Sequence, residues 1–222
     1  MPEAIPVVYE DDCCVVFDKP SGLLVVPTPK KELHTLDRLV NLQLKDSLAG
    51  VRLFPCHRLD RDTSGVILFA KGREIQEHLM EAFKRHYVRK NYIAFVQGKL
   101  PYPTGEIKSE IKDLSDQRFH GERKGKIAIT QYKVKERRKG YTVVEVFPIT
   151  GRTNQIRIQF SEIKHPLLGE RIYAFGRDFE LKFRRTALHA SSLEWQHPKN
   201  RRTVKVTAPL PQDMEQFLMR NL

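Results

Sequence analysis

Residues 57–62 (HRLDRD) place one histidine, two arginines and two aspartates directly ahead of a TSG turn and an apolar run over 66–70. A short run rich in branched residues and introduced by turn residues predicts a buried central strand. An acid at the entrance of such a strand has a fixed backbone and an accessible side chain, so Asp60 and Asp62 are candidate catalytic acids. An acid that must be ionised at neutral pH needs an arginine partner, because a guanidinium lowers the pKa of a nearby carboxyl group.

These residues alone leave several alternatives open. The segment fits an ordinary polar turn whose charges pair with one another. It also fits a metal-dependent nuclease in which His57, Asp60 and Asp62 hold magnesium, although turn geometry makes convergence of the two aspartates awkward. A non-catalytic RNA-binding module is the third alternative. It predicts that replacing Asp60 leaves every function intact.

A second polar segment covers residues 149–160 (ITGRTNQIRIQF). Alternation predicts a strand with Gln155, Arg157 and Gln159 on one face and apolar residues on the other. An arginine in such a position is typical of a cleft lining, because buried arginines are paired with acids or phosphates. An edge strand with a solvated face fits the same pattern.

The elements around these segments are mixed. Residues 7–17 predict two short strands around an acidic turn, and amphipathic spacing predicts helices over 36–44 and 73–86, the second with Ile75, Leu79, Met80 and Phe83 on one stripe. From residue 92 onward the pattern predicts strands, interrupted by a long polar loop over 99–126 and followed by a helix over 211–222. We therefore expect a single α+β domain over 1–222, built on a large, mostly antiparallel sheet.

The composition indicates a polyanionic partner. The 222 residues contain 39 Lys and Arg against 27 Asp and Glu, a formal net charge of +12. For a chain with no predicted secretion signal or membrane span, nucleic acid is the expected counterpart of such a charge. Three cysteines without spaced pairs favour neither a disulfide framework nor a zinc site, and hence predict a reducing, cytoplasmic location. The candidate backbone-contacting cations are Lys30, Lys31, Lys84, Arg85, Arg89, Lys90, Arg137, Arg138, Lys139, Arg184, Arg185, Arg201 and Arg202.

Several separate segments together resemble the RluA-like family of pseudouridine synthases, which isomerise uridine in RNA. They are KPSGLLVVP, HRLDRDTSGVILFAK, RKNYIAFVQG, PITGRTNQIRIQ, KHPLLGERIY and LHASSLEWQHP. Their order and spacing follow the family over nearly the whole chain, and the combination is far more specific than any one piece. The resemblance implies a large mixed, mostly antiparallel sheet with flanking helices and a central active-site cleft. It also implies an RNA substrate, ribosomal or transfer, and no cofactor or metal.

The resemblance assigns roles residue by residue. Asp60 is implied to be the essential catalytic aspartate and Arg157 the arginine that pairs with it. Tyr92 resembles the active-site tyrosine that stacks on the target base. Arg58 resembles the residue that fills the space left by the extruded uridine, and Leu188 is implied to wall the pocket.

The chain departs from the family pattern at Asn154, where histidine is expected, and at Gln159, where a second histidine is common. These departures affect details of RNA contact more than the chemistry. The resemblance begins within the first ten residues, so we expect a stand-alone catalytic domain without an S4-like RNA-binding domain, and the charge favours a monomer.

Overall fold

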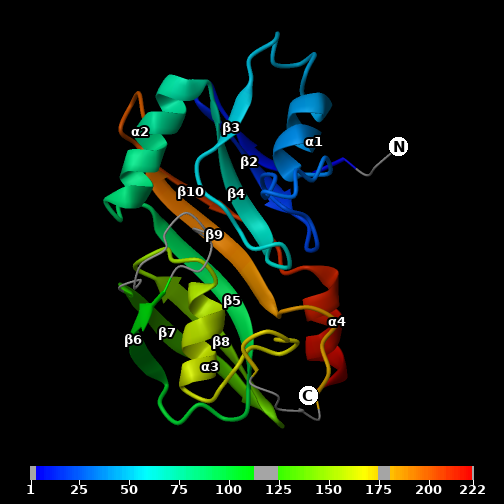
Figure 1. The fold of residues 1–222 in the computed structure, drawn as a ribbon, viewed down its shortest axis with the longest axis vertical. Coiled ribbons are helices and arrows are strands. Elements are labelled where there is room, and N and C mark those ends of the chain that lie inside the picture. The colour runs from blue at the N-terminus through cyan, green and yellow to red at the C-terminus, as the bar shows by residue number, and fades with distance from the viewer. Residues whose placement is uncertain (1–3, 113–124, 175–180, 222) are drawn as a thin grey trace. The chain divides into compact units, whose positions relative to one another are not determined.

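The computed structural model describes residues 4–112, 125–174 and 181–221. Two compact units divide the chain (Figure 1). Unit 1 comprises Met1–Lys90 and His189–Gln212, and unit 2 comprises Asn91–Leu188 and Asp213–Leu222. Each unit is described separately below, and the expectation of one catalytic domain over 1–222 stays a prediction.

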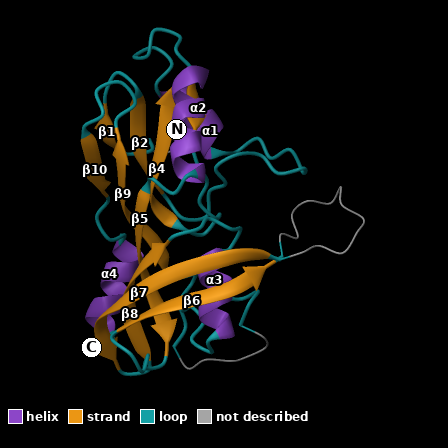
Figure 2. Cartoon of the chain, turned by 90° about the vertical axis from the view of Figure 1, so that its left-hand side faces the viewer, coloured by secondary structure: helices purple, strands orange, loops and turns teal. Residues whose placement is uncertain are grey.

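Unit 1 is a sheet covered by two helices. Its strands run in the order β1-β2-β4-β9-β10, with β3 paired to β4, and β4 is parallel to β9 while the other pairs are antiparallel. Helix α2 packs against β3 and β4, and α1 packs against β3 (Figure 2). The elements are β1 (Val7–Glu10), β2 (Cys14–Lys19), α1 (Leu36–Gln43), β3 (Leu53–Pro55), β4 (Ser64–Lys71), α2 (Arg73–Lys84), β9 (Leu188–Gln196) and β10 (Thr203–Thr207).

The predicted central strand is confirmed, because β4 is buried along its whole length except at its last residue. Both predicted helices of this unit are also confirmed. The apolar stripe expected on the second helix is only partly right, since Leu79 is buried and Met80 is exposed. Strand β3 was not predicted, because three residues are too short to show a period.

Unit 2 is an antiparallel sheet in the order β5-β8-β7-β6. Helix α3 packs on β6 and β7 (Figure 2). The C-terminal helix α4 contributes Phe217 to an aromatic cluster with Phe95, Tyr141 and Phe183. The elements are β5 (Arg89–Gln97), β6 (Thr104–Ile111), β7 (Lys126–Arg138), β8 (Tyr141–Pro148), α3 (Gln155–Glu162) and α4 (Gln212–Arg220).

The strand predicted within residues 149–160 is wrong, because Gln155–Glu162 form helix α3. Residues four positions apart share a face in a helix as well as in a strand, so the pairs Gln155 and Gln159, and Ile156 and Phe160, fit either period. Tertiary contacts decide for the helix. The amide of Gln155 donates to the Ile129 carbonyl and the amide of Gln159 to the Ala128 carbonyl, both at 3.0 Å.

The long loop predicted over 99–126 is also partly wrong. Strand β6 occupies Thr104–Ile111 and pairs with β7 over its whole length. The alternation of Ile107 and Ile111 on its buried face was hidden by the charged residues between them. Residues 113–124 of that segment lie outside the described residues.

The expected α+β class with a mixed, mostly antiparallel arrangement is confirmed. None of the helices in the described ranges combines the length and the apolar character that a membrane span requires.

Candidate active-site residues and their supports

The turn that carries Asp60 in unit 1 is fixed by its backbone. The Asp60 carbonyl accepts the Thr63 N–H at 3.2 Å, which closes the turn ahead of β4. The next carbonyl, that of Arg61, accepts the Gly22 N–H at 2.8 Å and the Lys19 ammonium at 3.0 Å. Asp60 is partly buried and Arg58 is exposed. The backbone of this turn is held by these contacts ahead of β4. The catalytic role of Asp60 stays a prediction.

Lys19 is a fully buried ammonium group. It donates to the carbonyls of Pro20 and Leu23, both at 2.8 Å, as well as to that of Arg61. A buried charge is tolerated only with such hydrogen bonds. Lys19 therefore ties the end of β2 to the turn that holds Asp60.

His57 supports the same turn from the other side. Its Nε2 atom accepts the N–H of Leu68 at 3.1 Å, and its ring stacks on Phe83 of α2 with centroids 4.6 Å apart. Burial, together with the nearby charge of Lys90, lowers the pKa of His57 to about 3. Burial likewise lowers the pKa of Lys90 to about 8. A neutral imidazole whose Nε2 is occupied by a strand N–H does not suit the magnesium-ligand role considered for His57 in a nuclease.

The TSG turn explains why β4 begins where it does. Gly65 has φ +109°, and a Cβ atom there would lie 2.2 Å from the Ala190 carbonyl oxygen of β9. Glycine is therefore required for the close approach of the two strands. Beside it, the Ser64 hydroxyl lies 3.0 Å from His189 Nδ1, which adds a side-chain link between β4 and β9.

In unit 2, Arg157 on α3 forms a buried ion pair with Glu170. The Arg157 Nε and Nη2 atoms donate to the two carboxylate oxygens at 2.7 and 2.9 Å. Glu170 also accepts the backbone N–H groups of Ile172 and Tyr173. Burial raises the pKa of Glu170, but the hydrogen bonds and charge of Arg157 and the two N–H groups outweigh it, so the net pKa is lowered. This carboxylate is thus held ionised.

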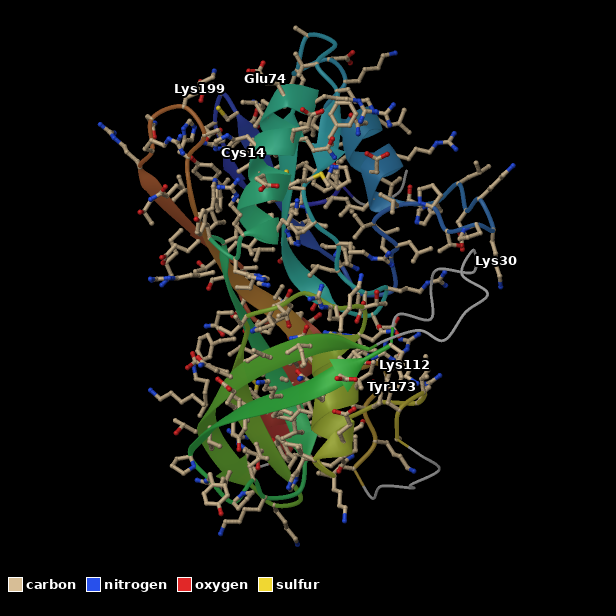
Figure 3. All side chains as sticks on the ribbon, turned by 60° about the vertical axis from the view of Figure 1, so that its left-hand side comes forward. Cys14, Lys30, Glu74, Lys112, Tyr173 and Lys199 are labelled. Carbon is tan, nitrogen blue, oxygen red and sulfur yellow. The ribbon has the colours of Figure 1, made fainter. Side chains whose placement is uncertain are left out.

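Two further side chains complete the support of Arg157. The Asn154 side chain accepts from Arg157 Nη1 and donates to the Tyr173 hydroxyl, each at 3.0 Å. The Arg157 guanidinium also lies over the Tyr173 ring, 5.2 Å from its centroid. Tyr173 lies beside α3 (Figure 3). Asn154, noted as a departure from the family pattern, is therefore part of the support of Arg157.

Tyr92 and Leu188 are both buried in unit 2. Tyr92 lies on β5 opposite Val146 of β8. The Leu188 carbonyl accepts from Arg185 Nη1 at 3.1 Å, and Arg185 itself forms a two-pronged ion pair with Asp213. This contact fixes the backbone at Leu188.

The predicted site residues thus belong to both units. Asp60 and Arg58 lie in unit 1, whereas Tyr92, Arg157 and Leu188 lie in unit 2. The pairing of Asp60 with Arg157 stays a prediction.

Sequence reasoning missed Glu170, Asn154 and Tyr173 as partners of Arg157. The requirement that a buried arginine has an acidic partner is the signal that points to the glutamate of LLGE.

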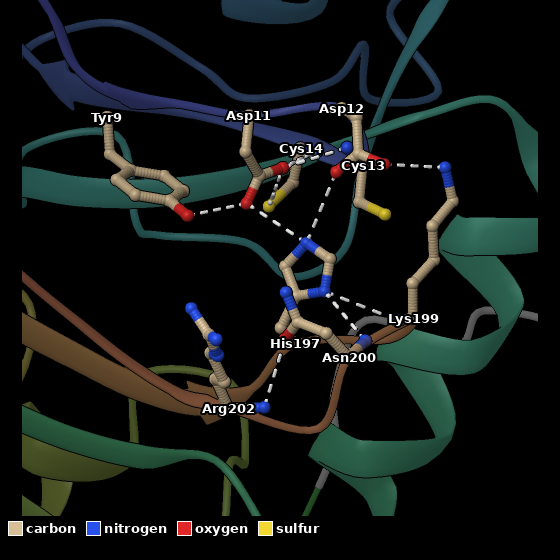
Figure 4. Close-up of polar contacts among 9 residues, drawn as sticks. All are labelled: Tyr9, Asp11, Asp12, Cys13, Cys14, His197, Lys199, Asn200 and Arg202. Carbon is tan, nitrogen blue, oxygen red and sulfur yellow. Dashed lines mark hydrogen bonds and ion pairs between the residues drawn. The ribbon is translucent and has the colours of Figure 1, made fainter.

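A second polar cluster in unit 1 has the donor types of a metal site. One ligand atom each from Asp11, Asp12, Cys13 and His197 lies within 4.8 Å of the others (Figure 4). The Cys13 thiol is buried, and burial followed by the charge of Asp12 raises its pKa, which disfavours the thiolate. Lys199 already places its ammonium 2.7 Å from Asp12.

The orientation of His197 also opposes a metal. Its Nδ1 accepts the backbone N–H groups of Lys199 and Asn200, both at 3.3 Å, so its proton is on Nε2. That N–H faces Asp11 Oδ2 at 3.2 Å. A histidine that binds a metal through one nitrogen normally donates a proton from the other, and here the other faces two donors. The hydrogen bonds and ion pairs of this cluster connect the β1–β2 turn to the β9–β10 turn.

The formal net charge of +12 has the sign that a nucleic-acid partner requires. The family model described as RNA pseudouridylate synthase matches residues 14–162. The chain belongs to this family, whose enzymes isomerise uridine in RNA to pseudouridine.

Relatives with the same assignment match almost the whole chain. The chain is 35% identical to "Ribosomal large subunit pseudouridine synthase D" of Xylella fastidiosa, over 98% of this chain and 70% of that protein. It is 32% identical to "Ribosomal large subunit pseudouridine synthase C" of Haemophilus influenzae, over 96% and 68%. The solved structure of "Human RNA Pseudouridylate Synthase Domain Containing 4" has the same fold, with a TM-score of 0.81 at 23% identity over 96% of this chain and 92% of that one.

Proposed function

We propose that the chain converts uridine to pseudouridine in large-subunit ribosomal RNA, with Asp60 as the catalytic carboxylate. The observation that carries the assignment of Asp60 is its place in the HRLD turn, whose backbone is fixed by Thr63, Gly22 and Lys19 ahead of β4. The names of the two bacterial relatives, which are ribosomal large subunit pseudouridine synthases, support the choice of RNA.

The reaction breaks the bond between N1 and C1′, turns the uracil and joins C5 to C1′. It needs no redox step and no group donor. Asp60 acts either as a nucleophile at C1′ or as a base that removes a proton from C2′, and both routes require an ionised carboxylate. Confinement of the detached base next to the ribose then favours recombination at C5.

Arg157 is proposed to keep Asp60 ionised. Glu170 and Asn154 engage Nε and one N–H on each terminal nitrogen of Arg157. A guanidinium held in one orientation presents parallel N–H groups in a fixed plane, and such groups match the two oxygens of a carboxylate. Glu170 would then orient Arg157 and Arg157 would orient Asp60.

Three further side chains would contact the extruded nucleoside or fill the space that it leaves in the RNA. Tyr92 would stack on the uracil and help the proton leave C5, while Leu188 would wall the pocket. Arg58, exposed next to Asp60, would fill the vacancy in the RNA, because a planar guanidinium both stacks and reaches phosphates. This would offset part of the few kcal/mol that flipping a base costs.

The test of Asp60 is a pair of substitutions in one turn. Asp60→Asn should abolish pseudouridine formation in ribosomal RNA while RNA binding is retained, and Asp62→Asn should leave turnover near the wild-type rate. Pseudouridine mapping across total RNA from cells with and without the chain would identify the nucleotide. Product formation by Asp60→Asn would refute the catalytic role, and loss of turnover with EDTA would favour the nuclease-like alternative.

The pairing of Asp60 and Arg157 is tested by the pH dependence of turnover. Arg157→Gln should move the acidic limb of the kcat profile to higher pH, because the pKa of Asp60 rises when its guanidinium partner is lost. Arg157→Lys keeps the charge and is the matched control. An unchanged acidic limb in Arg157→Gln would contradict the pairing.

Tyr92→Phe should retain binding but slow turnover.

We further propose a cytoplasmic monomer that works without a cofactor. The three free, buried cysteines suit a reducing compartment. Light scattering at micromolar concentration should give one chain per particle, and a dimer would refute this part of the proposal.

A further inference from the structure

The turn over residues 84–89, between α2 and β5, places an aromatic ring in water. Helix α2 ends at Lys84, and His86 takes a left-handed conformation with φ +61°. The N–H groups of His86 and Tyr87 donate to the carbonyls of Phe83 and Ala82 in the last turn of the helix, so the backbone of the turn is hydrogen-bonded to α2. Val88 is buried beside the strand, whereas Tyr87 is 69% exposed. The fold thus fixes the backbone of this ring while leaving the ring uncovered.

Exposed cations lie on both sides of Tyr87 in the sequence of the turn. The side chains of Lys84, Arg85 and Arg89 are 80%, 61% and 84% exposed. Their acidic partners are Glu81, 2.7 Å from Arg85, and Glu194, 3.2 Å from Arg89. Ion pairs of such exposure contribute little to stability, so these cations can exchange a carboxylate for a phosphate at small cost.

The β9–β10 edge adds to the positive charge. Lys205 on β10 is exposed and lies opposite Glu194 of β9 in the sheet register. We define the basic patch as the turn together with Lys205. It holds four cations, which are Lys84, Arg85, Arg89 and Lys205, and two carboxylates, which are Glu81 and Glu194. Its net charge has the sign that RNA attracts.

The turn is connected to the catalytic loop within unit 1. Phe83, one residue before the turn, stacks on His57, which is the first residue of HRLD. His57 in turn holds the N–H of Leu68 on β4. Lys90, at the other end of the turn, is close enough to lower the pKa of His57. The turn and the loop that carries Asp60 therefore share a packing contact through Phe83 and His57.

We propose that residues 84–89 form an RNA-docking surface, on which Tyr87 stacks an unpaired base of the substrate RNA while Lys84, Arg85 and Arg89 contact phosphates. Every base has a π-face, so a tyrosine contributes affinity without selecting sequence. A hydrophobic protein partner would use the exposed ring but not the cations, and a partner bound only by charge would use the cations but not the ring. RNA uses both, because it offers bases for stacking and phosphates for ion pairs. The proposal rests on the proposed function, because that function makes RNA the occupant of this surface.

The ring is tested with two probes that differ only in their bases. One is a fluorescein-labelled single-stranded RNA of mixed sequence, and the other is a ribose-phosphate chain of the same length without bases. Tyr87→Ala should weaken binding of the first about 5-fold or more, the range for loss of one stacked base, and leave the second unchanged. Tyr87→Trp should retain binding. Tyr102→Ala removes an equally exposed ring (68%) in unit 2 and is the matched control.

The cations are tested with salt. The double substitution Lys84→Gln and Arg89→Gln should weaken both probes and reduce the slope of log K against log salt by about 0.7 for each lost phosphate contact. Equal loss of the two probes in Tyr87→Ala, or no loss in either, would overturn the stacking role. An unchanged salt slope in the double variant would overturn the phosphate contacts.

Turnover separates this inference from the proposed function. Tyr87→Ala should raise KM for the ribosomal RNA substrate and leave kcat unchanged, whereas Asp60→Asn should remove product and leave RNA binding intact. A normal KM in Tyr87→Ala with an inactive Asp60→Asn would overturn the docking surface alone. A raised KM in Tyr87→Ala with an active Asp60→Asn would overturn the role of Asp60 alone. Equal melting temperatures of Tyr87→Ala and wild type would show that the effect is not one of folding.

Discussion

Replacing Glu170 with glutamine should damage both stability and turnover. The carboxylate oxygens accept from two nitrogens of Arg157 and from the N–H groups of Ile172 and Tyr173. A glutamine amide placed there in either orientation turns an NH₂ group toward donors, so at least one contact becomes repulsive. The guanidinium is then left in a largely buried position without its counter-charge.

The size of the expected loss in unfolding free energy follows from the burial of the Arg157–Glu170 ion pair. The side chains of Arg157 and Glu170 are 11% and 0% exposed, so the loss belongs to the class of broken buried ion pairs, about 3 kcal/mol. For a chain of this length that corresponds to a melting temperature lower by roughly 6–12 °C. The variant should still fold, because typical stabilities are about 5–15 kcal/mol.

The assay is thermal unfolding followed by circular dichroism, with kcat measured below the transition. Glu170→Asp, which keeps the charge, should recover part of both losses. Glu162→Gln, an exposed substitution at the end of α3, should change neither. A Glu170→Gln variant with wild-type melting temperature and kcat would refute the view that this pair orients Arg157.

The pH dependence gives a second check with a definite sign. The folded-state pKa of Glu170 lies below its usual value, so its contribution to stability is present above that usual value and is lost as the pH falls through the folded pKa. The difference in stability between wild type and Glu170→Gln should therefore be constant near neutral pH and shrink in acid below about pH 4.5. A difference that grows on acidification would contradict this account.

Four other predictions concern unit 1. Because the pKa of His57 is about 3, its NMR ring signals should not shift between pH 5 and 8, and His57→Ala should lower both the melting temperature and kcat, because Leu68 loses its acceptor. Gly65→Ala should prevent normal folding, seen as insoluble expression, since the new Cβ would lie 2.2 Å from Ala190 O. A tenfold excess of Zn²⁺ should not raise the melting temperature, since His197 presents an N–H to the cluster; a clear rise would show a metal site.

Part of the fold could be predicted from local pattern. The run 66–70 gave β4 because its branched residues are continuous and the TSG turn precedes them. The helices over 36–44 and 73–86 followed from their apolar spacing. Two strands were missed. In β6 the charged residues between the buried isoleucines obscure the alternation, and β3 has only three residues, too few to show a period.

The segment over 155–160 shows why the rest could not be predicted. Its alternating polar and apolar residues fit a strand and a helix equally well over so short a length. The helix is chosen by buried amide contacts from Gln155 and Gln159 to strands β6 and β7, which lie far away in the sequence. A local period contains no information about such contacts.

The sequence by itself determined the family, the place of Asp60 ahead of a buried strand, and the need for an acidic partner wherever an arginine is buried. Only the tertiary structure decided that Glu170 and Asn154 accept hydrogen bonds from Arg157 on α3. The reason is that this contact depends on a chain reversal at Gly169, where φ is +74° and a Cβ atom would collide with the Arg185 carbonyl. Adjacent residues encode a strand or a helix, but an ion pair of this kind exists only after distant backbone segments have packed against each other.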